Sequence, residues 1–223
     1  MPIPVRDVMT PHVVTVPESA PFKEVAGLLA AHRIGALPVL NPVGHVVGII
    51  SEADLLLKQR YPHAAETARL IEPGRLRGER HRADGRTAAM IMSAPAVTVA
   101  PDTTVTQAAR LMHARRIKHL PVVDGAGRLA GIVSRADLVR VFLREDAAIL
   151  ADLRELLRVQ PGVDPGRVSI TVTEGVVTLG GTVERRTAAR TLALLTRELD
   201  GVVGVDDRLD ATVDDLAVPY PLP

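Results

Sequence analysis

The sequence contains no cysteine and no tryptophan among its 223 residues, and it has only two tyrosines and two phenylalanines. Without cysteine, neither a disulfide framework nor a thiolate nucleophile can form. The scarcity of aromatic rings counts against binding of single-stranded nucleic acids, in which bases stack on aromatic side chains. The core must therefore be built from Val, Leu, Ile and Ala, which supply most of the 47% of residues that are hydrophobic.

The sequence also lacks the signals of secretion, membrane insertion and familiar catalysis. Its first residues do not show a basic segment followed by an apolar one, and no apolar run is long enough to span a bilayer. The seven histidines do not have zinc-site spacing, and neither a Gly-x-Ser-x-Gly nor a Walker motif occurs. We therefore expect a cytoplasmic protein that is not an enzyme, with no catalytic residue, no metal and no required cofactor.

What the sequence does contain is an internal repeat at a constant offset of 83 residues. The repeated stretches are Met9-Thr10 and Met92-Ser93, residues 33–39 and 116–122, and residues 48–55 and 131–138. Each copy predicts a strand, a helix, two further strands and a second helix, because short β-branched runs alternate with stretches of helical periodicity. A copy of roughly 50 residues is marginal alone, so we expect the two copies to pack as a pseudo-twofold pair.

The pattern changes between the copies and after them. Residues 59–86 are rich in arginine and glycine, and we interpret them as a basic, solvated linker or insertion. From residue 146 to residue 214, two amphipathic helical stripes and three alternating stretches predict a smaller α-β-β-α-β domain. The predicted fold class is thus α/β (α+β), with the copies at 1–58 and 87–144 and a disordered tail at 215–223.

Both copies resemble CBS motifs, and the pair resembles a Bateman module. The resemblance rests on the Met-Thr or Met-Ser opener, a Thr-Val before the first helix, Ile-x-x-Leu-Pro-Val, a glycine turn and Gly-Ile-(Ile/Val)-Ser-x-x-Asp-Leu. Residues 174–183 and 200–205 resemble a BON domain, a module implicated in phospholipid or partner binding. The resemblance implies a bacterial protein whose CBS pair binds an adenine nucleotide (AMP, ADP or ATP) or S-adenosylmethionine in clefts between its motifs.

Ser51-x-x-Asp54 and Ser134-x-x-Asp137 stand at predicted strand-to-helix junctions and allow two interpretations. An ionised carboxylate can accept hydrogen bonds from both ribose hydroxyls, and a serine at a helix N-terminus can donate to a phosphate. The same spacing is that of a capping box, in which the serine side chain caps the helix and the acidic side chain accepts a hydrogen bond from the serine backbone amide. The family resemblance favours ligand binding, more strongly for Asp137 than for Asp54.

The copies differ at the two positions before Leu-Pro-Val, where the resemblance implies side chains that reach phosphates. The first copy has Gly35 and Ala36, whereas the second has Lys118 and His119. We therefore expect one competent cleft, mainly on the second motif, because positive charge attracts phosphate. The alternative interpretation of Lys118 and His119 is a solvated pair on the surface with no role in binding. The predicted ligand-binding residues are Thr98, Val99, Arg116, Lys118, His119, Leu120, Pro121, Ile132, Ser134 and Asp137, and a weaker secondary site comprises Thr15, Val16, Arg33, Ser51 and Asp54.

These observations lead to a hypothesis of a regulatory, non-catalytic sensor. An adenylate small molecule binds the CBS pair, and the BON-like domain acts as a relay or interaction module that contacts a protein partner. The alternative is a ligand-independent adaptor that homodimerises through its CBS helices, and a third hypothesis is nucleic-acid binding through the basic linker. Membrane binding is not expected, because residues 144–223 carry a net charge of −5 and anionic lipid attracts basic segments.

Overall fold

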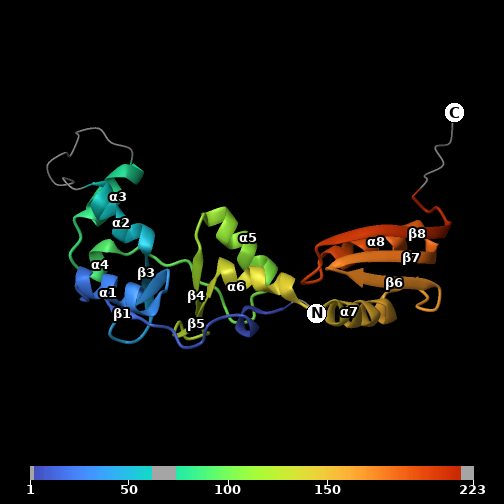
Figure 1. Ribbon diagram of the computed structural model, residues 1–223, viewed down its shortest axis with the longest axis horizontal. Helices are drawn as coiled ribbons and strands as arrows, with labels where there is room; N and C mark the ends of the chain where they lie inside the picture. The colour runs from blue at the N-terminus through green and yellow to red at the C-terminus, as the bar shows by residue number, and fades with distance from the viewer. Residues whose placement is uncertain (1–2, 62–73, 217–223) are drawn as a thin grey trace. The chain divides into compact units, whose positions relative to one another are not determined.

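The computed structural model describes residues 3–61 and 74–216, and Figure 1 shows the order of its helices and strands. The chain forms two compact units, which divide between Arg135 and Ala136. The first unit, residues 4–135, contains the two copies of the repeat except for the last helix of the second copy, and the second unit contains that helix, the C-terminal domain and Ile3. Helices and strands follow one another much as the sequence pattern indicates, which confirms the predicted α/β fold class.

The two copies of the repeat form matching series of elements. The first copy contains η1 (Val5–Asp7), β1 (Val16–Pro17), α1 (Phe22–His32), β2 (Ala36–Leu40), β3 (Val46–Ser51) and α2 (Glu52–Arg60). The second contains α4 (Ala88–Ile91), α5 (Val105–Arg115), β4 (His119–Val123), β5 (Leu129–Ser134) and α6 (Arg135–Val139). Helices α1 and α5 both end at a left-handed arginine, Arg33 with φ 53° and Arg116 with φ 55°. This C-cap turns the chain directly into the next strand.

Each copy pairs its strands in the same register. Strand β2 lies antiparallel to β3, with Leu37 opposite Ile50, and β4 lies antiparallel to β5, with Leu120 opposite Val133. In the first copy, strand β1 runs parallel to β2. In the second copy, the corresponding pairing is a single parallel bridge between Val99 and Val122 of β4. The repeat in the sequence is therefore a repeat of strand pairing as well.

The two copies exchange the arms that precede their first strands. Thr10 of the first copy pairs with Ile132 in β5, and Ser93 of the second copy pairs with Ile49 in β3. Each pairing consists of two backbone hydrogen bonds of 2.9 to 3.1 Å. Each copy thus supplies an edge to the sheet of the other, which explains why one copy alone would be incomplete.

A methionine on each arm packs against a glycine of the other copy. A Cβ atom on Gly48 would lie 2.3 Å from Met92 Sδ, and one on Gly131 would lie 2.5 Å from Met9 Sδ. No real Cβ atom tolerates such distances, so both strands need glycine at this position. The Met opener and the Gly-Ile stretch, which are separate features in the sequence, form one contact in the structure.

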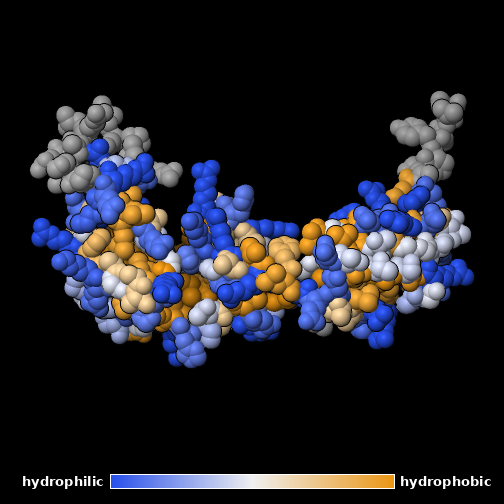
Figure 2. All heavy atoms as spheres, in the orientation of Figure 1, coloured by the Kyte–Doolittle hydropathy of each residue, from blue (hydrophilic) through white to orange (hydrophobic). Residues whose placement is uncertain are grey.

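The core of the first unit is aliphatic, as the lack of aromatic residues requires. In the first copy, Val25, Leu37, Val39 and Ile50 are fully buried, together with Ile91 from α4 of the second copy. Figure 2 shows that apolar residues also reach the surface of both units among the hydrophilic side chains.

Part of the predicted solvated linker is a helix that packs against the first copy. Helix α3 (Gly74–Ala83) contacts α2, beside which it lies in Figure 1. Lys58 Nζ donates hydrogen bonds to the carbonyl oxygens of Ala83 and Gly85, both at 3.1 Å. Residues 62–73 of the linker lie outside the described residues. The interpretation as a solvated segment is therefore wrong for the part around α3, whose carbonyl groups are bound by the first copy.

The second unit continues from α6 through η2 (Arg140–Leu143) into the predicted α-β-β-α-β arrangement. Its elements are α7 (Asp146–Val159), β6 (Val168–Thr173), β7 (Val176–Arg185), α8 (Arg186–Arg197) and β8 (Gly204–Val213). Strand β7 is central, antiparallel to β6 and parallel to β8. Ile149, Leu153, Leu179 and Leu192 are fully buried between the helices and this sheet.

The start of the predicted disordered tail is bound to this unit. Asp215 accepts hydrogen bonds from the Thr187 amide at 2.9 Å and from the Thr187 hydroxyl at 2.6 Å. These bonds lie at the N-terminal turn of α8, where orphan amides need acceptors. Residues 217–223 of the tail lie outside the part of the chain that the structure describes.

Candidate ligand-binding site

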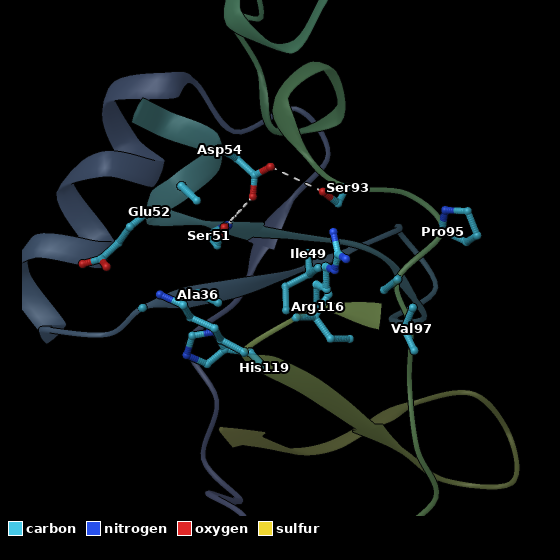
Figure 3. A pocket seen from close by; sticks show the side chains of 15 residues that line it. Ala36, Ile49, Ser51, Glu52, Asp54, Ser93, Pro95, Val97, Arg116 and His119 are labelled. Atoms are coloured by element: carbon cyan, nitrogen blue, oxygen red, sulfur yellow. Dashed lines mark hydrogen bonds between the residues drawn. The ribbon is translucent and has the colours of Figure 1, made fainter. Parts of the chain in front are cut away.

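A cavity of about 280 Å³ lies within the first unit, and it draws its lining from both copies of the repeat. The contributing segments are the start of β2, the junction of β3 and α2, the arm that follows α4, and the turn from α5 into β4. Figure 3 shows the side chains that line the cavity, with Asp54, Ser93, Arg116 and His119 around it and Glu52 pointing away. The lining residues are Gly35, Ala36, Ile49, Ser51, Glu52, Ala53, Asp54, Ser93, Pro95, Ala96, Val97, Arg116, Ile117, Lys118 and His119.

The difference between Gly35 and its counterpart Lys118 has a steric cause. Gly35 lies against the imidazole of His119, and a Cβ on Gly35 would be 2.9 Å from His119 Cε1 and 3.0 Å from Nε2. The starts of β2 and β4 meet at this point, so a bulky side chain on one copy requires a small residue on the other. The copies therefore differ here because they share one space, and His119 occupies it.

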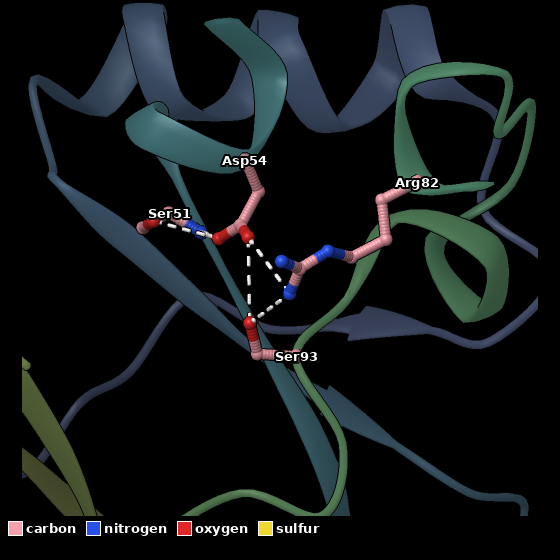
Figure 4. Close-up of polar contacts among 4 residues, drawn as sticks. All are labelled: Ser51, Asp54, Arg82 and Ser93. Carbon is pink, nitrogen blue, oxygen red and sulfur yellow. Dashed lines mark hydrogen bonds and ion pairs between the residues drawn. The ribbon is translucent and has the colours of Figure 1, made fainter. Parts of the chain in front are cut away.

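Asp54 is the acidic group of the cavity that has the most hydrogen-bond partners in the structure. Its Oδ2 accepts hydrogen bonds from the Ser51 amide at 2.9 Å and from the Ser51 hydroxyl at 2.7 Å, within a capping box at the start of α2. Its Oδ1 accepts from Ser93 Oγ at 3.3 Å and lies 3.5 Å from Arg82 Nη1. Figure 4 shows these contacts around the carboxylate. Ser51-x-x-Asp54 is thus a capping box in the structure, in which Oδ2 of Asp54 is used within the motif. Oδ1 contacts residues outside the motif, Ser93 and Arg82.

Basic groups reach the cavity from the second copy. Arg116 is the left-handed C-cap of α5, and Lys118 and His119 follow it into β4. Arg116 and Lys118 are exposed, and His119 is half-buried. A solvent-facing rim of positive charge can attract an anion from solution, because partly exposed groups keep their charge at little desolvation cost. Arg116, Lys118 and His119 are the members of the predicted second-copy set that line this cavity.

The other predicted residues of the second copy occupy different places. Val99 and Leu120 are buried in the core, Thr98 is half-buried beside Val99, and Pro121 is paired with Ile132 in the β4–β5 ladder. Ser134 ends β5 opposite His119. Asp137 lies in α6 within the second unit, where its Oδ1 is 3.4 Å from Arg140 Nη1. None of these side chains belongs to the cavity lining.

The predicted secondary site is divided in a similar way. Ser51 and Asp54 line the cavity, Val16 is buried in the first-copy core, Thr15 is half-buried next to it, and Arg33 is the exposed C-cap of α1. The cavity therefore combines Ser51 and Asp54 of the predicted weaker site with Arg116, Lys118 and His119 of the predicted main site.

Sequence reasoning missed the residues that the arm of the second copy contributes. Ser93, Pro95, Ala96 and Val97 line the cavity because Ser93 is bound to Ile49 of the first copy. The Met-Ser opener was visible as a repeated motif, but no local pattern says which copy the arm will join. Arg82 was also missed, because it lay in a segment that was interpreted as a linker.

Two other classes of site are not found in the parts of the chain that are described. Over residues 3–61 and 74–216, no group of three or more His, Asp or Glu side chains is placed to hold a metal ion. Over the same ranges, no helix has both the length and the apolar character needed to cross a membrane.

Comparison with known proteins agrees with this architecture. The CBS domain model matches residues 5–60 and 88–144, and the BON domain model matches residues 145–212. An uncharacterized protein of Methanocaldococcus jannaschii is 33% identical over 155 residues, which are 69% of this chain, and the matched region spans only 35% of that relative.

Two solved structures have similar folds. The structure of CBSX2 in complex with AMP is 27% identical, with a TM-score of 0.54, over 67% of this chain and 98% of the other. A CBS domain pair in complex with 5-methylthioadenosine and S-adenosyl-L-methionine is 26% identical, with a TM-score of 0.51, over 64% of this chain and 97% of the other. The chain therefore belongs to the CBS domain proteins, with two CBS motifs followed by a BON domain.

Proposed function

We propose that this protein is a non-catalytic regulatory sensor that binds an adenine nucleotide in the cavity between its CBS motifs. The observation that carries the proposal is that Asp54 lines the same cavity as the basic side chains of Arg116, Lys118 and His119. A nucleotide presents ribose hydroxyls, which a carboxylate accepts, and phosphates, which cationic donors bind. The AMP complex of CBSX2 and the S-adenosyl-L-methionine complex of the other CBS pair support this ligand class.

Within this class, the charges favour AMP, ADP or ATP over S-adenosylmethionine. The latter carries a sulfonium cation, which a cluster of basic groups repels, whereas a phosphate is attracted. The cavity volume of about 280 Å³ lies just below the range of small-molecule pockets, roughly 300–1,000 Å³. That size suits one mononucleotide whose phosphates extend toward the exposed rim.

The adenine base would be held by aliphatic side chains. The cavity has Ile49, Val97 and Ile117 in its lining, and no Phe, Tyr or Trp is among the lining residues. Aliphatic walls on both faces of a purine bury apolar area without stacking on a ring. Selectivity for adenine would then depend on hydrogen bonds to backbone groups.

The test is a thermal-shift panel with AMP, ADP, ATP and S-adenosylmethionine, followed by calorimetric titration. A ligand present at 100 times its Kd stabilises the folded state by about 2.7 kcal/mol, so a clear rise in Tm is expected. Adenosine is the matched control, because it has the ribose and base but no phosphate. If none of these compounds raises the Tm at millimolar concentration, the proposed function is wrong.

We also infer that the CBS pair forms a homodimer through its helices. Leu56 in α2, Val139 in α6, and Phe142 and Leu143 in η2 are 57%, 62%, 57% and 78% exposed and are the apolar side chains that such an interface would cover. The ligand-independent adaptor would be supported instead by two results together. Light scattering would show the same dimer with and without AMP, and no adenylate would raise the Tm. Glutamate at Leu56 or Phe142 is expected to shift the protein toward monomer.

We propose that the BON domain relays or localises the response by contacting a protein partner in the cytoplasm. Support comes from the outer face of α8, where Arg186, Arg190 and Leu194 are exposed. The nucleic-acid alternative depends on the arginines of the insertion, and Arg82 is already engaged with Asp54. Binding of DNA or RNA that weakens steeply with salt would restore that alternative.

A further inference from the structure

Helix α3 places an arginine on the carboxylate that the proposed ligand needs. Arg82 Nη1 lies 3.5 Å from Asp54 Oδ1 and donates a 2.7 Å hydrogen bond to Ser93 Oγ, which in turn lies 3.3 Å from the same oxygen. The side chains of Arg82 and Asp54 are 28% and 12% exposed. Figure 4 shows the guanidinium approaching from the opposite side of Asp54 to Ser51.

Both oxygens of Asp54 are engaged by these contacts. A carboxylate offers about four lone-pair sites, and the Ser51 amide and hydroxyl use the two sites on Oδ2. The Ser93 hydroxyl donates to Oδ1, and the Arg82 guanidinium forms an ion pair with the same oxygen. A ribose hydroxyl that binds Oδ1 would therefore approach the place held by Arg82, which has the longest of these contacts.

The attachment of α3 to the first copy is largely polar. Besides the contact of Arg82, it includes the Lys58 hydrogen bonds, a 3.1 Å bond from the Tyr61 hydroxyl to Glu79 and an ion pair of 3.7 Å between Arg60 and Glu79. It also includes a cation–π contact of Arg80 with the Tyr61 ring and a small apolar contact between Leu57 and Ala83. An isolated helix of this length is unstable in water, so its order depends on these contacts. In addition, Arg82 Nε is buried without a hydrogen-bond partner among the described residues, which costs free energy in the docked state.

We propose that Arg82 and the ligand compete for Asp54 Oδ1, so that α3 is a tethered latch that ligand binding releases. The inference rests on the proposed function, and it identifies the release of α3 as the structural change that ligand binding produces. When the ligand hydroxyls take Oδ1, α3 loses its contact with the cavity and exposes the face of α2 around Leu57 and Lys58. By linkage, the factor by which docking of α3 lowers the affinity for the ligand equals the factor by which the ligand lowers the equilibrium constant for docking of α3.

The first experiment measures AMP affinity by calorimetry in the wild type and in Arg82→Met, which keeps the aliphatic length but removes the charge. Removal of a partly buried ion pair is expected to tighten AMP binding about fivefold, which corresponds to ~1 kcal/mol. Arg86→Ala is the matched control, because Arg86 is an exposed arginine of the same segment and its deletion removes the same charge. Its affinity for AMP should equal that of the wild type.

The outcomes separate the latch from the proposed function. Tighter AMP binding by Arg82→Met than by the wild type, with no change in Arg86→Ala, supports the latch. Equal or weaker binding by Arg82→Met overturns the latch and leaves nucleotide sensing intact. If neither protein binds any adenylate, the proposed function is overturned and the latch with it.

The second experiment follows amide hydrogen exchange of residues 78–85, which include the bonds from Asp84 to Arg80 and from Gly85 to Arg82. Without ligand, Asp54→Asn and Arg82→Met should each raise exchange in this stretch, and the double variant should raise it no further. With AMP, the wild type should reach the same raised level. Unchanged exchange in the two single variants overturns the latch independently of any ligand.

Discussion

Gly35→Ala is a direct test of the steric reason for the difference between the two CBS motifs. The new Cβ would lie 2.9 Å from His119 Cε1, well inside the usual carbon–carbon separation of about 3.5–4.0 Å. The backbone of Gly35 is outside the left-handed region, so alanine meets no local strain there. The only cost is displacement of the imidazole, which must leave its rotamer or shift with β4.

The magnitude follows from two opposing terms. Crowding of a packed site costs about 1–3 kcal/mol, whereas replacing glycine by alanine at a permitted backbone stabilises by about 0.4–1 kcal/mol through the unfolded state. We therefore expect Gly35→Ala to destabilise the wild type by about 1 kcal/mol. In a His119→Ala background the clash is absent, and the same change should be neutral or stabilise by about 0.5 kcal/mol.

The assay is a double-mutant cycle of urea denaturation followed by circular dichroism. Gly27→Ala is the matched control, because Gly27 lies inside α1 and has nothing within 4 Å of its potential Cβ. It should stabilise by about 0.5–1 kcal/mol in both backgrounds. If Gly35→Ala has the same effect with and without His119, the two residues do not share one space and the explanation of the asymmetry is refuted.

Three further results are expected. Lys118→Ala should weaken AMP binding about tenfold in calorimetry while leaving adenosine binding unchanged, and an equal loss for both ligands would show that Lys118 does not face the phosphate. Gly131→Ala should destabilise by about 1–3 kcal/mol in urea, because its Cβ would be 2.5 Å from Met9 Sδ and 3.0 Å from the Thr10 carbonyl; adding Met9→Ala should recover only part. The backbone amide of Arg128 holds the pKa of Asp124 below its usual value, helped by the Ala126 amide and the Arg128 side chain. Stability from this group is present above the unfolded pKa of about 3.9 and is lost as pH falls through the lower folded pKa, so urea midpoints should drop less in acid for Asp124→Asn than for the wild type.

An acidic group from one motif and basic groups from the other line the same cavity, so the proposed site is asymmetric although the module is duplicated. Exchange of the arms brings Ser93 beside Asp54, and the turn after α5 brings Lys118 to the same cavity. The small side of this shared space belongs to the first motif, where Gly35 leaves room for the imidazole of His119. The two motifs therefore have to differ in sequence at this point, because a large residue from one and a small residue from the other share the same space.

The sequence by itself determined the elements and their order. The offset of 83 residues, the alternation of β-branched runs with amphipathic stripes and the change of pattern near residue 146 predicted two repeated units and a separate C-terminal domain. The resemblance of the repeated motifs and of residues 174–183 and 200–205 to known families identified these parts as a CBS pair and a BON domain, which the family models confirm. These features are local, since they depend on side-chain periodicity and on turn residues that act within a few positions. They also marked Lys118, His119 and Ser51-x-x-Asp54 as polar features of interest.

Only the tertiary structure decided which of these residues meet. The partner of Asp54 in the cavity comes from the other motif, because each arm pairs with the strand of its neighbour, as Ser93 does with Ile49. The docking of Arg82 on Asp54 likewise depends on contacts between Lys58 and the end of α3. Such contacts join residues that are distant along the chain, and their free energy depends on complementary shape and on hydrogen bonds that no local periodicity encodes.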